Sequence, residues 1–255
     1  MAERLQEGRN WWSVVHNKFV VEERYVSSRE RTALYRAAVV LVVVGVAVFL
    51  ATLIGVLHSD GIASADEAAQ RWLIGTHSDT LTGVMRAVAV GFGPVGLPII
   101  VLVATITWGL LAKHAWRPML LAAAMLTGVG LAQIIGASVQ RPRPPVDQML
   151  FGPDHTFSFP SGHVLGASDF LLVTCYLVFS RVRKPAAARV GFAVAIFLIV
   201  LAAASRLYLG YHWVSDTVAS ISLSLVVLGA VMALDTWRTV RIPLEPVTGV
   251  APGTG

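Results

Sequence analysis

Long apolar stretches separated by short polar segments dominate the chain. Six of these stretches are apolar enough and long enough to cross the hydrocarbon core of a bilayer, which is about 30 Å thick and requires about 20 helical residues. We expect the spans at approximately 34–57, 92–113, 117–138, 162–180, 189–206 and 214–236. The predicted fold class is therefore all-α, a polytopic membrane protein with six transmembrane helices.

The polar segment between the first two spans, residues 58–91, has a pattern of its own. It contains residues typical of helix caps, followed by apolar side chains at roughly helical spacing, among them Trp72, Leu81 and Met85. This pattern predicts one or two short amphipathic helices at the membrane interface. Packing against the bundle is the simpler interpretation of these helices, and guarding a substrate entrance is the alternative.

Positive charge is distributed unevenly between the two sets of loops. With a cytoplasmic N-terminus, 15 of the 20 Lys and Arg residues fall on the inner side. Both termini are then cytoplasmic, and this bias accounts for the pI of 9.8 better than nucleic-acid binding does. We expect one transmembrane domain at 32–238, in the plasma membrane, between a cytoplasmic tail at 1–31 and a flexible cytoplasmic tail at 239–255.

Composition agrees with this assignment, because 55% of the residues are hydrophobic and only 14% are charged, and the mean hydropathy is +0.68. A soluble domain of this size needs more surface charge. The N-terminal 31 residues contain no apolar run before a small-residue cleavage site, so a removable signal peptide is not expected.

Three segments that we place on the outer side carry polar residues of the kind that membrane chains usually avoid. They are QRPRPP at 140–145, FPSGH at 159–163 and SRLYLGYHWVSD at 205–216. Each lies at the outer end of a predicted span, so the fold brings all three to one membrane depth. Ionisable residues at such positions are rare and usually functional. We therefore expect a single site at the outer rim of the bundle.

The residue types in these segments suit phosphate chemistry. Arg143 and Arg206 carry planar, permanently charged groups that bind phosphoryl oxygens in pairs. Ser161 is a candidate helix N-cap and Gly162 allows close backbone approach, so the N–H groups of residues 162 and 163 form an anion site at a helix N-terminus. His163 stands at the same place as a candidate proton donor.

The last segment supplies a candidate nucleophile. If a helix begins near Tyr211, His212 and Asp216 are four residues apart on one face. Asp216 then accepts the Nδ1 hydrogen of His212, leaves Nε2 free to attack phosphorus, and stabilises the charge that the ring gains. Taken singly, each segment also has a structural interpretation, as a helix cap, a turn or an arginine that meets lipid headgroups. Three such segments in series on one face favour a catalytic site.

These segments resemble the motifs of the type 2 phosphatidic acid phosphatase (PAP2) superfamily, K-x6-RP, PSGH and SR-x5-H-x3-D. The second motif matches fully at 160–163, and the third matches at Ser205, Arg206, His212 and Asp216. The first matches only at Arg143 and Pro144. The resemblance extends to the six-span layout with an outer catalytic face, and so covers most of residues 34–236.

The resemblance implies a lipid phosphatase that hydrolyses a phosphomonoester or diphosphate of a lipid headgroup without metal or cofactor. His212 would attack phosphorus and form a phosphohistidine, Asp216 would orient it, and His163 would protonate the leaving oxygen. The phosphoryl oxygens would be held by Arg143, Arg206, Ser161 and the Gly162 amide. The expected partners are a lipid phosphate and the bilayer, with no nucleic acid, and the oligomeric state stays open.

One departure from the family pattern concerns the first motif, where the expected lysine is replaced by Gly136. Arg141 or Gln140 is the candidate to fill that part of the phosphate shell, and the alternative for Arg141 is a contact with lipid headgroups. A catalytically impaired membrane scaffold of the same fold is the competing hypothesis. Asp169, inside the fourth span, either packs with Ser, Thr or backbone partners or modulates the charge of the site.

The substrate is the least determined part of the prediction. We expect a polyprenyl diphosphate, such as undecaprenyl diphosphate, in preference to phosphatidic acid or phosphatidylglycerol phosphate. A vanadate-dependent haloperoxidase uses a similar anion site but is soluble, and a transporter would leave the paired histidines without a role.

Overall fold

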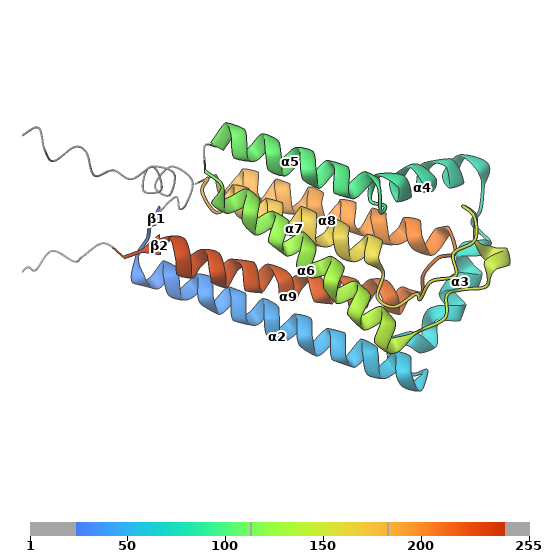
Figure 1. Cartoon of the computed structure of the whole chain (residues 1–255). Coiled ribbons are helices and arrows are strands. Elements are labelled where there is room, and N and C mark those ends of the chain that lie inside the picture. The colour runs from blue at the N-terminus through green and yellow to red at the C-terminus, as the bar shows by residue number, and fades with distance from the viewer. Residues whose placement is uncertain (1–23, 113, 183, 243–255) are drawn as a thin grey trace, which may run out of the picture.

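The computed structural model describes residues 24–112, 114–182 and 184–242 (Figure 1). Most of the predicted N-terminal tail and the predicted flexible segment from residue 243 onward lie outside these ranges. The elements, in chain order, are β1 (Arg24–Tyr25), α2 (Ser28–His58), the 3-10 helix η2 (Gly61–Ala65), α3 (Asp66–Ile74), α4 (Asp79–Gly91), α5 (Gly96–Ala112), α6 (Trp116–Val139), the 3-10 helix η3 (Val146–Gln148), α7 (Gly162–Phe179), α8 (Pro185–Tyr208), α9 (Val214–Thr239) and β2 (Val240–Arg241).

The all-α membrane fold is confirmed. Helices α2, α6, α7, α8 and α9 are each long and apolar enough to cross a bilayer, and α4 with α5 adds a sixth span if that pair, bent by 48°, counts as one. The bend falls at Gly93 and Pro94. A proline disfavours helical conformation in the residue before it and lacks an N–H to continue the helix, so the chain breaks there.

Helix α9 lies at the centre of the bundle and α2 runs along it (Figure 1). The buried residues of α2 include Ala38, Gly45 and Thr52, which recur every seven residues and so share one face. A Cβ on Gly45 would come within 2.6 Å of the Ser222 carbonyl oxygen, and one on Gly229 within 2.7 Å of the Ala38 oxygen. Small residues therefore allow the two backbones to touch, as expected where helices pack inside a membrane.

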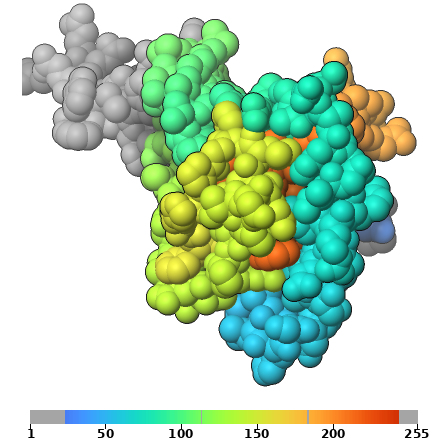
Figure 2. Space-filling view, turned by 90° about the vertical axis from the view of Figure 1, so that its right-hand side faces the viewer, coloured from blue at the N-terminus to red at the C-terminus, as the bar shows by residue number. Residues whose placement is uncertain are grey.

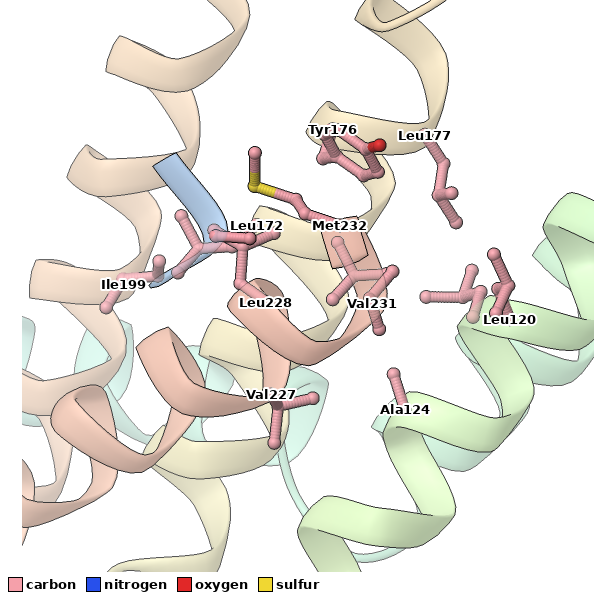
Figure 3. Packing of buried hydrophobic residues seen from close by; sticks show 13 residues of the cluster. Leu120, Ala124, Leu172, Tyr176, Leu177, Ile199, Val227, Leu228, Val231 and Met232 are labelled. Atoms are coloured by element: carbon pink, nitrogen blue, oxygen red, sulfur yellow. The ribbon is translucent and has the colours of Figure 1, made fainter. Parts of the chain in front are cut away.

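The apolar core is formed by α6, α7, α8 and α9 (Figure 3). Leu121, Val173 and Leu177 are fully buried there, and Ile199 of α8 and Leu228 of α9 belong to the same cluster. Large apolar side chains also cover the outside of α2, α5 and α8, as a surface that faces lipid requires.

The segment between α2 and α5 forms short helices, as predicted, and they pack against the bundle. The Tyr208 hydroxyl accepts a hydrogen bond from the Ser78 backbone nitrogen at 2.9 Å, and the His77 Nε2 atom lies 3.0 Å from the Tyr208 carbonyl oxygen. These bonds hold the start of α4 to the end of α8. The packing interpretation of this segment is thus supported, and α4 also lines a cavity described below.

At the opposite end of the bundle, segments that we had assigned to the two tails contain structure. The strands β1 and β2 pair in parallel, with Arg24 opposite Val240. Beside them Asp235, which is 0% exposed, accepts hydrogen bonds from Trp116 Nε1 at 3.0 Å and Tyr176 OH at 2.9 Å. Both terminal nitrogens of Arg181 donate to the same carboxylate, at 2.8 and 2.9 Å. This Asp235 cluster joins α6, α7 and α9.

Candidate active site

The three polar segments meet at the end of the bundle where α3 lies. Figure 2 shows this end: the yellow-green segment between α6 and α7 and the blue-green segment between α2 and α5 cover it, and orange residues from the α8–α9 region are visible between them. The connection between α8 and α9 is thus enclosed by two segments that are distant from it in sequence.

His212 is held in one tautomer. Its Nδ1 atom lies 2.8 Å from the Ser158 carbonyl oxygen and 3.4 Å from Asp216 Oδ2. Both neighbours can only accept a hydrogen, so Nδ1 carries it and Nε2 keeps its lone pair. The Arg143 Nη1 atom lies 3.1 Å from that Nε2 atom. The predicted His212–Asp216 pair is present, and the Ser158 carbonyl is an additional partner that side-chain motifs cannot reveal.

Burial sets the charge state of His212. The ring is 2% exposed, and removal from water lowers the pKa of His212 to about 4, although the hydrogen bond to Asp216 opposes this shift. Arg206 and Arg143 lower the pKa further. The imidazole is therefore neutral near pH 7, the form in which Nε2 carries no proton.

Arg143 faces His212 and is fixed by the loop before α7. Its Nη1 donates to the Tyr211 carbonyl oxygen at 2.7 Å, and its Nη2 donates to Thr156 Oγ1 at 2.8 Å and pairs with Asp154 Oδ2 at 3.1 Å. Burial lowers the pKa of Arg143, and Asp154 and Asp216 oppose that shift. Sequence reasoning missed Thr156 and Asp154, because they belong to no motif and reach Arg143 only through the fold of the loop.

Arg206 is placed differently from Arg143. It is 4% exposed, its guanidinium lies over the Tyr211 ring at 4.2 Å, and its Nε atom has no hydrogen-bond partner within the described part of the chain. A buried cation with unused donors favours an anion nearby. Arg206 lines a cavity of about 480 Å³ together with His163, Asp154 and Tyr211.

The PSGH segment forms the start of α7. Ser161 occupies the N-cap position, as predicted, but its hydroxyl makes no capping bond, and its buried Oγ has no partner within the ranges that the structure describes. Open space lies in front of Gly162, since an added Cβ would meet nothing within 4 Å. The exposed N–H groups of this helix start and the unused Ser161 hydroxyl are thus available to an anion.

His163 stands where two cavities meet. The second cavity, of about 590 Å³, runs between α5 and α6 over α7 and is lined mainly by apolar residues such as Leu97, Val101 and Met125. Gly93, Pro94 and His163 line both cavities. The two cavities therefore adjoin at this histidine.

Arg141 lies behind the nucleophile pair. Its Nη1 donates to Asp216 Oδ1 and to Ser215 Oγ, both at 2.6 Å, and its Nη2 donates to Asp66 Oδ2 at 2.7 Å. The hydrogen bonds that the structure shows for Arg141 thus go to protein groups, and its role as a phosphate ligand stays a prediction. Sequence reasoning missed Asp66 altogether.

Asp169 lies deep in α7, away from any ion pair in the described ranges. It is 0% exposed, and neither carboxylate oxygen has a hydrogen-bond partner among the described residues. A Cβ on Gly128 would come 2.1 Å from its Oδ2 atom, so the carboxylate packs directly on α6. Both predicted roles of Asp169 therefore stay predictions.

The fold and the site together define a helical membrane protein with a buried histidine–aspartate pair, and with a cavity nearby that Arg206 and His163 line. Residues 117–239, which include all three polar segments, match the family model described as "PAP2 superfamily". This similarity to the PAP2 superfamily, over slightly less than half of the chain, supports a membrane lipid phosphatase.

Two comparisons with individual proteins agree with this assignment. The chain is 27% identical over 193 residues to phosphatidylglycerophosphatase B of Bacillus subtilis (strain 168), covering 73% of this chain and 91% of that protein. It also resembles the crystal structure of a transmembrane PAP2 type phosphatidylglycerolphosphate phosphatase from Bacillus subtilis. The TM-score is 0.67 at 26% identity, with 75% of this chain and 96% of that chain covered.

Proposed function

We propose that the protein hydrolyses the phosphate or diphosphate of a lipid headgroup through a phosphohistidine on Nε2 of His212. The observation that carries this proposal is the tautomer of the buried ring: Nδ1–H is bonded to the Ser158 carbonyl at 2.8 Å and the lone pair of Nε2 faces the cationic side. A neutral, oriented imidazole is what nucleophilic attack on phosphorus requires.

In the first step, Nε2 of His212 attacks phosphorus and the bond between phosphorus and the lipid oxygen breaks. His163, on the wall of the polar cavity, gives its proton to that leaving oxygen. The ring of His212 becomes positively charged, and Asp216 Oδ2, 3.4 Å from Nδ1, stabilises this charge. In the second step, water attacks phosphorus and gives a proton to His163. The bond between phosphorus and Nε2 of His212 breaks, which releases phosphate and restores the neutral ring.

Arginines and helix N–H groups supply the positive field in this scheme. Arg143 Nη1 now lies 3.1 Å from His212 Nε2. When substrate is bound, this N–H group would donate to a phosphoryl oxygen instead. Arg206, with its unused Nε, would bind a second oxygen. The Gly162 amide and Ser161 Oγ are the remaining candidates, in front of α7.

The lipid would enter sideways. Its chains would occupy the apolar groove between α5 and α6, and its phosphate the polar cavity, with the scissile bond at His163 where the two join. We place this site on the outer face of the plasma membrane with both termini cytoplasmic, because of the charge bias of the loops.

The names of the relatives make phosphatidylglycerophosphate the first substrate to test. Undecaprenyl diphosphate, which we expected from the sequence, is the second, and phosphatidic acid is the third. The purified protein in detergent micelles would be given each lipid separately, with a metal chelator present, and the released phosphate measured.

We expect phosphate release from at least one of these lipids, unaffected by the chelator. His212→Ala should reduce it by about 1,000-fold or more, because no other group replaces the nucleophile. Glu67→Gln, which changes an exposed carboxylate, serves as the control and should keep full activity. Equal activity of wild type and His212→Ala would reject the mechanism, and a folded wild type without activity on any lipid would support the scaffold hypothesis.

A further inference from the structure

We propose that Asp66, the first residue of α3, is a positioning residue for the His212–Asp216 pair and acts through Arg141. This inference rests on the proposed hydrolytic function and extends it to a residue outside the three motifs. Asp66 is 3% exposed although it lies in the segment between α2 and α5, 75 positions before Arg141.

A continuous series of hydrogen bonds links Asp66 to the nucleophile. Asp66 Oδ2 accepts from Arg141 Nη2 at 2.7 Å, and Arg141 Nη1 donates to Asp216 Oδ1 at 2.6 Å. The other oxygen of Asp216 accepts from the Trp213 backbone nitrogen at 2.9 Å and faces His212 Nδ1. Each oxygen of Asp216 thus has one fixed neighbour, and rotation of the carboxylate away from His212 would break both bonds.

The charges explain why a second carboxylate is useful. Arg141 alone would neutralise Asp216, whose negative charge must stabilise the cationic ring of His212 during phosphoryl transfer. With Asp66 also bound to the guanidinium, two carboxylates share one cation and the group keeps a net charge of about −1. All three side chains are largely removed from water, with side-chain exposures of 3%, 14% and 0% for Asp66, Arg141 and Asp216, so this balance is poorly screened.

Asp66 does not act on the substrate directly. It lines neither the polar cavity nor the apolar groove. It does contact the start of α9 in a second way, because its Oδ1 accepts from the Ser215 backbone nitrogen at 3.0 Å. A test must therefore separate the effect that passes through Arg141 from simple docking of α3 onto Ser215.

The variant Asp66→Asn removes the charge and keeps the shape of the side chain. We expect kcat to fall about tenfold or more, since partners one step behind a reacting group commonly change activity by about 10- to 100-fold at metal centres and the same reasoning applies here. KM should change by less than about twofold, because ground-state binding is untouched. Glu67→Gln is the matched control: the neighbouring carboxylate on the same helix, 80% exposed, should leave both constants unchanged.

The decisive comparison repeats Asp66→Asn in an Arg141→Gln background. If Asp66 acts through Arg141, its substitution costs less than about threefold in kcat there, because the cation that it balanced is gone. If it acts only by docking α3 onto Ser215, the loss is the same in both backgrounds, and the proposal is overturned. An unchanged kcat of Asp66→Asn in the otherwise wild-type chain also overturns it.

Orthovanadate provides a readout that does not need lipid turnover. As an anion that accepts a fifth ligand, it reports on bond formation by Nε2, whereas inorganic phosphate reports only on anion binding. We expect Asp66→Asn to weaken vanadate affinity by about tenfold, measured by the shift in thermal midpoint, and to leave phosphate affinity unchanged. Equal effects on both anions would contradict the proposal. Since His212→Ala should abolish the preference for vanadate, failure of the nucleophile assignment and failure of the role of Asp66 are distinguishable.

Discussion

Two buried carboxylates on α9, Asp216 at one end and Asp235 at the other, illustrate how similar residues serve different purposes. Both are 0% exposed and both bind an arginine. Asp235 receives both nitrogens of Arg181 and further bonds from Trp116 and Tyr176, so its oxygens are occupied by rigid neighbours. The Asp235 cluster therefore stabilises the packing of α6, α7 and α9.

Asp216 shares its arginine with a second carboxylate and directs one oxygen at His212, whose charge changes during the proposed reaction. The two sites therefore differ in how many of the hydrogen-bond partners of the carboxylate are permanent donors. A carboxylate whose partners are all permanent donors stabilises the fold, whereas one that faces a titratable group beside a cavity retains a function that the fold alone does not need.

The largest effect is expected at the catalytic end. Asp216→Asn should lower kcat by about 1,000-fold or more, since the amide cannot stabilise the ring charge and can favour the wrong tautomer of His212. The thermal midpoint should change little, because Arg141 keeps its bond to Asp66. Phosphate release and thermal unfolding in detergent measure the two quantities. A loss of folded protein in proportion to the loss of activity would show that Asp216 also stabilises the fold.

At Asp235 we expect the opposite result, a loss of stability without a loss of kcat. Asp235→Asn leaves the Arg181 charge buried without its carboxylate, which typically costs about 3–5 kcal/mol. The unfolding midpoint should fall clearly, while kcat per folded molecule stays unchanged. Asp79→Asn, an exposed carboxylate at the start of α4, is the control and should cost less than about 1 kcal/mol. A specific loss of kcat in folded Asp235→Asn would mean that the two ends are coupled.

The sequence distinguishes these two ends only in part. Hydropathy located the spans, and the spacing of Arg206, His212 and Asp216 marked the catalytic end, because those residues lie on one short stretch whose geometry is local. The Asp235 cluster carries no such signal, since its donors come from α6, from α7 and from the residues just beyond α7, and only the packed bundle brings them together.

Asp66 and the Ser158 carbonyl could not be predicted for related reasons. Asp66 looks like an ordinary first-turn acidic residue, and its pairing with Arg141 depends on how the α2–α5 segment folds back over the site. Ser158 contributes its backbone carbonyl oxygen, which every residue type has, so the sequence does not reveal this contact. The sequence places Arg141 near the site as a cation, but the partners of Arg141 are set by tertiary structure.

The smallest effect is expected in the pH dependence between neutral and mildly acidic conditions. A lowered pKa keeps His212 neutral on acidification, so with its pKa at about 4 the ring should stay more than about 90% neutral down to about pH 5. The acidic limb of kcat/KM, which reports the free enzyme, should therefore lie near pH 4 rather than near the ordinary histidine value of about 6.5.

Initial rates across a buffer series, with thermal midpoints recorded at each pH, would measure this profile. An acidic limb near 6.5 would mean that His212 is not the buried neutral ring that the structure shows, and a rate independent of pH from about 5 to 9 would remove the acid role of His163. Folded Asp235→Asn should reproduce the wild-type profile, because no histidine is among the described partners of Asp235. A profile displaced by that substitution would show that the charge at Asp235 affects His212 and His163, contrary to the separation of the two ends.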